Sequence, residues 1–273
     1  MKVLVTSNSF GKYSQVPKEK LEKNGFEVLS NPYHRMMEED EFIEALKGVD
    51  AVILSTEKVT KRVIDESPDL KMISRYGVGL DNIDLDYCKE KNIAITVTCG
   101  GNSNAVAEFT VMLMLAAFKG VGASSCYAKN GVWKKINGLD LAEKTVGVIG
   151  LGAIGKTVIE RLQGFHVHVL GYDIFYDENF VSKYNVKKAS VQEILENSDV
   201  ITLHIPATSD KPLLSYKEFE TMKNGVTIVN TARASLIDYD ALLQYLDSGK
   251  IFAAGLDAVS YTHLRAHETL RHL

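Results

Sequence analysis

Three glycines, Gly150, Gly152 and Gly155, follow a short β-branched run at 145–149 and precede an amphipathic stretch at 156–162. In a strand-to-helix connection of this kind the first glycine allows a tight turn, the second lets the backbone approach a pyrophosphate, and the third allows close packing of helix on strand. The anion would lie at the helix N-terminus. The pattern therefore predicts a dinucleotide site, and its expected contacts are Gly150, Gly152, Ala153, Ile154 and Gly155.

A carboxylate follows the next expected strand, which covers 167–172. Asp173 lies about twenty residues beyond the glycines, where a carboxylate accepts hydrogen bonds from a ribose hydroxyl. It would also repel the 2′-phosphate of NADP, and no Arg or Lys follows at 174–176. We therefore expect the cofactor to be NAD rather than NADP, with Asp173 binding its ribose. A methyltransferase could use a related turn for S-adenosylmethionine, so the turn alone leaves the reaction open.

The elements that must hold these residues alternate along the chain. Ser190 and Ser215 each have a glutamate three residues on and fit the capping box, and Gly225 and Gly249 supply helix stops. Strand and helix in repetition predict parallel sheets covered on both faces, and hence an α/β protein of two doubly wound units. The expected strands are 3–5, 26–29, 51–54, 72–74, 94–97, 145–149, 167–172, 200–205, 226–230 and 252–256.

One expected helix, 104–119, is apolar nearly all round. Such a helix is buried between layers or lies at a subunit contact, and this one would form a spine between the domains. Glu108 within it is either a functional acid or a carboxylate that braces the domain hinge.

Composition argues against several classes of function. The net charge is -4 and no basic stripe is present, which argues against a nucleic-acid partner. The longest apolar stretch, 111–118, is far short of the ~20 residues that cross a bilayer, and the start lacks a signal-peptide layout, so no membrane partner is expected. Cys88, Cys99 and Cys126 show no C-x-x-C or His/Cys ligand spacing. This predicts reduced thiols in a cytoplasmic protein, and no metal site.

Six segments together resemble the D-isomer-specific 2-hydroxyacid dehydrogenase family, closest to its phosphoglycerate dehydrogenase branch, over Met1 to Ala258. The resemblance implies a flavodoxin-like substrate domain at 1–99, a Rossmann NAD-binding domain at 100–259, and hydride transfer between NAD(H) and a D-2-hydroxyacid/2-oxoacid pair. The segments are Ser74–Asp84, Gly101–Glu108, the glycine turn, His204–Thr208, Asn230–Arg233 and Gly255–Asp257.

The resemblance implies that Arg233 is the catalytic arginine, which holds the substrate carboxylate and polarises the keto oxygen. The planar, permanently charged fork of arginine gives a carboxylate two parallel hydrogen bonds, which a lysine cannot reproduce. Arg233 also lies just past the strand 226–230, and open α/β sheets bind ligands beyond the C-terminal ends of their strands. Ala234 replaces the glycine usual in the family, a departure expected to matter little.

The loop Tyr76–Gly79 resembles the family's substrate loop, in which backbone N–H groups meet the other side of the carboxylate. Its two glycines allow that approach. The implied substrate-binding residues are Arg75, Val78 and Gly79. Arg75 would hold either a phosphate or a neighbouring acid, and the sequence leaves both open.

Further cofactor contacts follow from the same resemblance. His204 ends a strand and would touch the dinucleotide rather than transfer protons. The turn at 206–208 would line the nicotinamide side, and Asp257 would bind the nicotinamide carboxamide. The implied positions are His204, Pro206, Thr208, Thr231, Ala232 and Asp257.

The resemblance stops after Ala258, where the family continues with a catalytic glutamate and a histidine. Residues 260–273 have no clear apolar period, although they hold three of the seven histidines. We interpret 260–273 as a non-native tail on a truncated chain. Because reduction of a keto group needs a proton donor, the chain as written is expected to catalyse hydride transfer poorly. The full-length protein is expected to be a homodimer.

The substrate stays open among 3-phosphoglycerate, glycerate or hydroxypyruvate, glyoxylate, and D-lactate. Arg75 with Lys134 or Lys135 could form a phosphate site, which favours phosphoglycerate. A hypothesis of a different class is an NAD-sensing interaction protein on the same fold. Arg233 and the two-glycine loop favour the enzyme, because a sensor needs neither.

Overall fold

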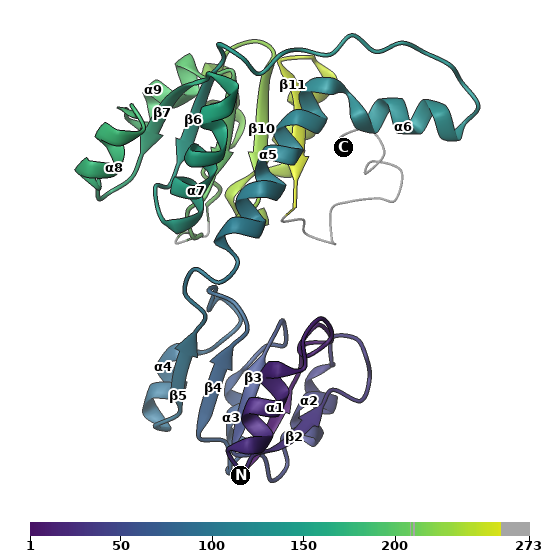
Figure 1. The fold of residues 1–273 in the computed structure, drawn as a ribbon, viewed down its shortest axis with the longest axis vertical. Coiled ribbons are helices and arrows are strands. Elements are labelled where there is room, and N and C mark those ends of the chain that lie inside the picture. The colour runs from purple at the N-terminus through teal and green to yellow at the C-terminus, as the bar shows by residue number, and fades with distance from the viewer. Residues whose placement is uncertain (208, 210, 258–273) are drawn as a thin grey trace. The chain divides into compact units, whose positions relative to one another are not determined.

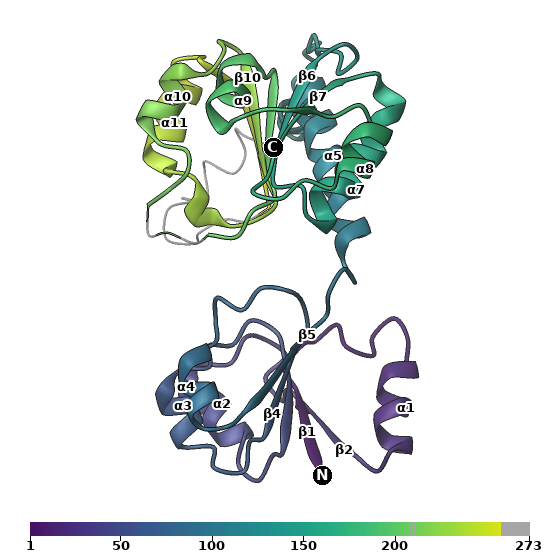
Figure 2. The ribbon, with the colours of Figure 1, turned by 90° about the vertical axis from the view of Figure 1, so that its left-hand side faces the viewer.

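The computed structural model describes residues 1–207, 209 and 211–257. The chain divides into two compact units, Met1–Gly101 and a second unit that begins at Asn102. Each unit is a parallel sheet with helices on both faces (Figures 1 and 2). The predicted α/β class with two doubly wound sheets is confirmed. The separate roles of the two domains stay predictions, as does the character of 260–273, which lies outside the described residues.

The first unit has strand order β2-β1-β3-β4-β5, the flavodoxin-like order, with every neighbouring pair parallel. Helix α1 covers one face and α2 to α4 cover the other (Figure 2). The core between them includes Leu4, Phe42 and Ile73. The strands are β1 (Lys2–Val5), β2 (Glu27–Ser30), β3 (Ala51–Leu54), β4 (Met72–Arg75) and β5 (Ala94–Val97), and the helices are α1 (Val16–Lys23), α2 (Glu39–Ala45), α3 (Lys61–Asp65) and α4 (Leu85–Glu90).

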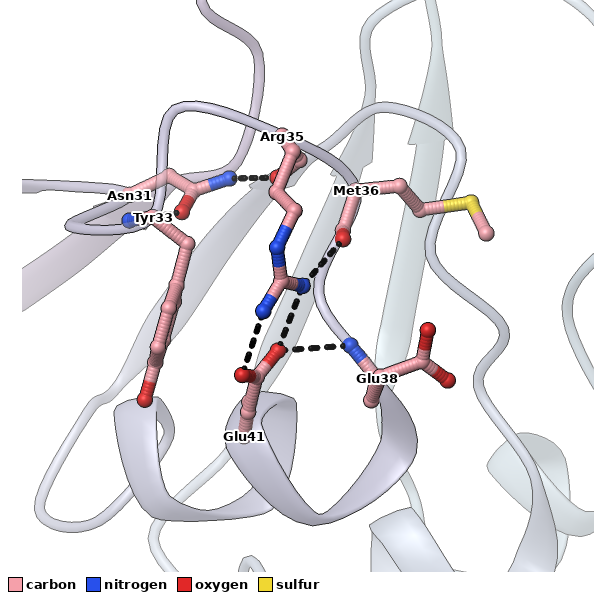
Figure 3. Close-up of polar contacts among 6 residues, drawn as sticks. All are labelled: Asn31, Tyr33, Arg35, Met36, Glu38 and Glu41. Atoms are coloured by element: carbon pink, nitrogen blue, oxygen red, sulfur yellow. Dashed lines mark hydrogen bonds and ion pairs between the residues drawn. The ribbon is translucent and has the colours of Figure 1, made fainter.

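The loop from β2 to α2 is held by side chains (Figure 3). The buried Asn31 amide donates to the carbonyls of Thr6 and Arg35 at 3.1 and 2.8 Å. Arg35 binds both carboxylate oxygens of Glu41 at 2.6 and 2.7 Å, and Glu41 accepts the N–H of Glu38 at the start of α2. The hydrogen bond from Arg35 lowers the pKa of the Glu41 carboxyl. The Arg35–Glu41 ion pair and the hydrogen bond from the Glu38 N–H to Glu41 thus both hold the start of α2.

The second unit has strand order β11-β10-β9-β6-β7-β8, also fully parallel, which is the Rossmann order. Helices α9 to α11 lie on one face, and α5, α7 and α8 lie on the other (Figure 2). The strands are β6 (Thr145–Ile149), β7 (His168–Tyr172), β8 (Lys187–Lys188), β9 (Val200–Leu203), β10 (Val226–Asn230) and β11 (Ile251–Leu256), and the helices on these faces are α5 (Ser103–Lys119), α7 (Ala153–Leu162), α8 (Glu178–Lys183), α9 (Val191–Asn197), α10 (Tyr216–Thr221) and α11 (Tyr239–Asp247).

Helix α5 packs on α7, β10 and β11 and ends at Gly120, whose φ of 63° is left-handed. Helix α6 (Val121–Lys129) follows, has no buried residue, and projects from the unit with the segment after it (Figure 1). The chain returns at Leu139, whose N–H binds the carbonyl of Phe118. We call residues 121–135 the arm. Within the described ranges no single helix is long and apolar enough to cross a membrane, and only α5 with α6, bent by 65°, reach that length together.

The predicted strands agree with those observed to within one or two residues, and both predicted capping boxes are present at Ser190 and Ser215. The predicted strand 200–205 ends earlier, at Leu203. Strand β8 was not predicted, because the two residues Lys187 and Lys188 carry no apolar alternation.

Candidate dinucleotide and carboxylate site

The glycine turn connects β6 to α7, and its three glycines differ in what a side chain would meet. A Cβ on Gly150, whose φ is 103°, would lie 2.6 Å from the carbonyl oxygen of His204, and a Cβ on Gly155 would lie 1.9 Å from that of Gly150. A Cβ on Gly152 would meet no protein atom within 4 Å. The fold itself therefore requires Gly150 and Gly155, whereas the space beside Gly152 is open for a ligand.

Donors face that open space. The first backbone hydrogen bond of α7 runs from Lys156 to Gly152, and no side chain caps the helix. The N–H groups of Ala153 and Ile154 in the first turn are thus left for an anion, which the partial positive charge of the helix N-terminus would also attract. These residues fit the pyrophosphate of a dinucleotide.

Asp173 follows β7 and lies beside the turn. Its carboxylate accepts the N–H of Leu151 at 2.6 Å and the N–H of Phe175 at 3.2 Å. The next two side chains, Ile174 and Phe175, are strongly exposed and carry no charge. The position and acceptor chemistry of Asp173 fit a ribose hydroxyl, and no cation follows it to take a 2′-phosphate.

His204 directly follows β9, on the other side of the turn. Its N–H binds the carbonyl of Ile149 at 2.8 Å, and its Nε2 lies 3.0 Å from the hydroxyl of Thr202. Burial lowers the pKa of His204 to about 4. The imidazole is therefore neutral near pH 7. That His204 touches the dinucleotide rather than transferring protons stays a prediction.

Arg233 lies in the loop after β10, where Asn230 organises the backbone. The buried Asn230 amide accepts the N–H of Ala232 at 3.0 Å and donates to the carbonyl of Arg233 at 2.8 Å. The Arg233 guanidinium donates to the carbonyl of Ala232 at 2.9 Å. Arg233 also lines a pocket of about 600 Å³ together with Pro212, Asp238 and Tyr239. The side chain is thus placed at the C-terminal edge of the sheet that carries the glycine turn.

A hydrogen bond ties this loop to α5. The hydroxyls of Thr110 and Thr231 lie 2.9 Å apart, and Thr110 also lies 2.8 Å from the carbonyl of Val106. Because Thr110 donates its one proton to Val106, it accepts the proton of Thr231. Thr110 is fully buried, so this contact fixes Thr231 from inside the unit.

Two other predicted positions, Pro206 and Asp257, lie on the same edge. Pro206 is exposed just beyond His204. Asp257 is exposed beyond β11, and its N–H binds the carbonyl of Asn230 at 3.0 Å. Thr208 lies outside the described residues. The structure thus brings the glycine turn, Asp173, His204, the Arg233 loop and Asp257 to one sheet edge, while their contacts with a cofactor stay predictions.

Arg75, Val78 and Gly79 belong to the first unit, in the loop after β4. Val78 is 43% exposed, and Gly79 follows it. The Arg75 guanidinium donates to the carbonyl of Gly79 at 2.7 Å, and to those of Leu54 and Tyr76 at 3.1 and 3.3 Å. It therefore grips the backbone of the loop, and direct substrate contact by Arg75 stays a prediction.

Sequence reasoning missed two residues that organise the Arg233 loop, Asn230 and Thr110. Asn230 stands at the end of an apolar strand, and Thr110 stands inside an apolar helix. A polar side chain in such a run is expected to be buried with a hydrogen-bond partner, which was the available signal. Glu108 accepts the amide of Asn104, a residue of the same helix, at 2.8 Å and is exposed. Whether it is a functional acid or a brace of the domain hinge stays open.

Within the described residues no group of three or more His, Cys, Asp or Glu side chains could hold a metal ion. Cys88, Cys99 and Cys126 are all free thiols.

The family match and the similar proteins point to the same family. Residues 111–273 match the family described as D-isomer specific 2-hydroxyacid dehydrogenase, NAD binding domain. The D-3-phosphoglycerate dehydrogenase of Archaeoglobus fulgidus is 37% identical over 241 residues, which cover 87% of this chain and 45% of that protein. The hydroxypyruvate reductase of Thermotoga maritima is 38% identical over 225 residues, covering 81% of this chain and 72% of that one. The chain thus spans about half the length of the phosphoglycerate dehydrogenases it matches.

A solved structure of a D-2-hydroxyacid dehydrogenase has a similar fold. The D-lactate dehydrogenase of Aquifex aeolicus, complexed with NAD and lactic acid, superposes with a TM-score of 0.79 and 30% identity, over 95% of this chain and 77% of that one. The family match and this neighbour confirm the prediction of NAD as the cofactor. With a family model that covers more than half of its residues, the chain belongs to the D-isomer specific 2-hydroxyacid dehydrogenase family.

Proposed function

We propose that the protein is an NAD-dependent oxidoreductase that interconverts a short D-2-hydroxy acid and its 2-oxo acid. The main support for this proposal is that Arg233 lines a pocket at the same sheet edge as the glycine turn. Strands β6, β9 and β10 are neighbours, so the turn after β6, His204 after β9 and Arg233 after β10 are adjacent in the sheet order. A dinucleotide bound across this edge would bring its reacting end toward Arg233.

Each part of the site has a separate task in this proposal. The N–H groups after Gly152 bind the pyrophosphate, and Asp173 binds the ribose. The bound NADH supplies the hydride. The fork of Arg233 holds the carboxylate of the acid and draws charge toward the keto oxygen. In the first unit, the loop with Val78 and Gly79 offers backbone donors that can bind a carboxylate.

The test is a pair of assays with this chain. NADH binding is followed by fluorescence titration, and NADH oxidation is followed with glyoxylate, hydroxypyruvate, pyruvate and 3-phosphohydroxypyruvate. Because the sequence analysis predicts that the catalytic glutamate and histidine of the family are lacking after Ala258, the same assays are run on a chimera that carries the segment of the Thermotoga maritima reductase after Asp257. Turnover of at least one acid supports the proposal and identifies the substrate. NADH binding without turnover by either protein would instead favour an interaction protein.

We also propose that the protein is a homodimer through the arm. Helix α6 buries none of its residues, and Trp133, which follows α6 within the arm, is 100% exposed. Beside the base of the arm lies an apolar groove of about 570 Å³, whose lining includes Val111, Met112 and Phe165. An exposed tryptophan and an apolar groove on one unit form a self-complementary pair, which a two-fold axis would satisfy twice.

The dimer is tested by sedimentation with Trp133→Glu. This substitution is expected to shift the protein toward monomer, whereas Tyr13→Glu, which alters a side chain 87% exposed in the first unit, should leave the mass unchanged. An unchanged mass for the Trp133 variant contradicts the arm contact. We further infer a cytoplasmic location, which the three free thiols support.

A further inference from the structure

The loop after β4 presents backbone donors with no protein partner. Gly77 has φ 151°, a region that favours glycine. In the described part of the chain, the N–H groups of Gly77, Val78, Gly79 and Leu80 donate to no protein acceptor, whereas the N–H of Tyr76 just before them binds the carbonyl of Leu54. A run of free N–H groups on a short loop can bind an anion.

Three of the four carbonyl groups of the same peptides, those of Tyr76, Gly77 and Gly79, are held by hydrogen bonds. In a trans peptide the C=O and the following N–H point in opposite directions. Arg75 holds the carbonyl of Tyr76, which turns the N–H of Gly77 away from the guanidinium. It holds the carbonyl of Gly79 at 2.7 Å, which does the same for the N–H of Leu80. The N–H of Thr98 binds the carbonyl of Gly77 at 2.9 Å, which turns the N–H of Val78 outward.

The loop packs closely round this guanidinium. A Cβ on Gly77 would lie 3.5 Å from Nη1 of Arg75, so the guanidinium occupies the inner side of the turn. A third bond from Arg75, to the carbonyl of Leu54 at 3.1 Å, anchors the loop to β3. The ring of Tyr76 rests edge-on against Phe10, with centroids 6.0 Å apart. The loop is thus fixed from the sheet and from the loop after β1.

We propose that Arg75 is a positioning residue, which shapes the backbone of this loop into a carboxylate site without itself touching the substrate. The inference rests on the proposed function and deepens it, because it assigns recognition by the first unit to the carboxylate that every 2-hydroxy acid shares. Lysine cannot replace arginine here, since a single ammonium group lacks the planar fork that reaches three separate carbonyls.

The experiment uses two ligands that share a carboxylate and differ by a phosphate, D-glycerate and D-3-phosphoglycerate. Each is titrated into the complex of the protein with NADH, for the unmodified chain, for Arg75→Lys, and for Arg62→Lys. Arg62 is the matched control, because it is an exposed arginine of α3 in the same unit. Amide exchange at Tyr76 and Thr98 is measured in parallel without ligand.

Arg75→Lys is expected to weaken both ligands by the same factor, about tenfold or more, and to leave NADH affinity unchanged. Exchange at Tyr76 and Thr98 should become faster, while Arg62→Lys alters none of these values. A loss confined to D-3-phosphoglycerate would make Arg75 a direct phosphate ligand and would overturn the inference.

The outcome stays separable from the proposed function. If the unmodified chain binds neither acid, the proposed function fails at this site, and the exchange measurement still decides the role of Arg75. Faster exchange at Tyr76 and Thr98 in Arg75→Lys then supports its positioning of the loop. Unchanged exchange in that variant overturns the inference whatever the ligands do.

Discussion

Gly152→Ala should separate the ligand from the fold, because a Cβ at this position meets no protein atom within 4 Å. The backbone of Gly152 has φ -71° and ψ -166°, which alanine adopts without strain. Removing the freedom of glycine in the unfolded chain should then raise the unfolding free energy by about 0.4 to 1 kcal/mol. For a chain of this size that corresponds to a melting temperature roughly 1 to 4 °C higher without cofactor.

The same methyl group would occupy the space where the pyrophosphate must approach. Loss of one hydrogen bond to a charged phosphate costs about 1.5 to 3 kcal/mol, so NADH affinity should fall roughly 10- to 150-fold. Gly164→Ala is the matched control, since its Cβ also meets nothing and the residue lies away from the turn. Gly155→Ala should do the opposite of Gly152→Ala to the free protein and lower its melting temperature, because its Cβ would lie 1.9 Å from a carbonyl oxygen.

The measurements are thermal unfolding without ligand and fluorescence titration with NADH, on all three variants. The reasoning is refuted if Gly152→Ala binds NADH as tightly as the unmodified chain and as Gly164→Ala. In that case the open space beside Gly152 does not face the cofactor.

Three further outcomes are expected. Asp173→Asn, which keeps an acceptor for the Leu151 N–H and removes the charge, should narrow the preference for NADH over NADPH by about 1.5 to 3 kcal/mol; equal affinities in the unmodified chain would contradict this role. Arg233→Lys in the active chimera should lose most of kcat/KM with NADH affinity nearly unchanged, and normal turnover would show that another residue holds the carboxylate. Burial lowers the pKa of His204 to about 4, so between pH 6.5 and 4 the unfolded chain binds a proton that the folded chain does not. The unfolding free energy should therefore fall as the pH falls through this range. His204→Asn should reduce the difference between urea midpoints at pH 7 and pH 5, and an equal difference would argue against a buried neutral histidine.

The sequence predicted the parts of the fold that repeat a local pattern. The strand 145–149 and the glycine turn were predicted with their observed bounds, because β-branched runs and glycine spacing are local signals. The capping box at the start of α2 was not predicted, since its N-cap residue is Glu38 and not the usual Ser, Thr, Asp or Asn.

The contacts that organise the site could not be predicted from local sequence patterns. Thr110 and Thr231 are 121 residues apart in the sequence, and only the packing of α5 against β10 brings their hydroxyls together. The partners of Arg75 in the structure include three carbonyls of neighbouring backbone, which the sequence did not indicate. The phosphate and the acid that the sequence offered as its partners stay predictions. Such backbone partners depend on how a loop folds back on its own strand, which residue types alone do not specify.

Strand β8, at one edge of the second sheet, contains only two residues, Lys187 and Lys188. An exposed strand edge is a template on which another chain can add a strand, and short, lysine-bearing edges resist such addition through charge and lack of length. The Nζ of Lys188 is paired with Glu178, while both β8 residues are exposed. This edge should therefore not start aggregation through intermolecular β-strand pairing when the protein is concentrated. Replacing both lysines with valine would remove that protection and leave the glycine turn and Arg233 untouched.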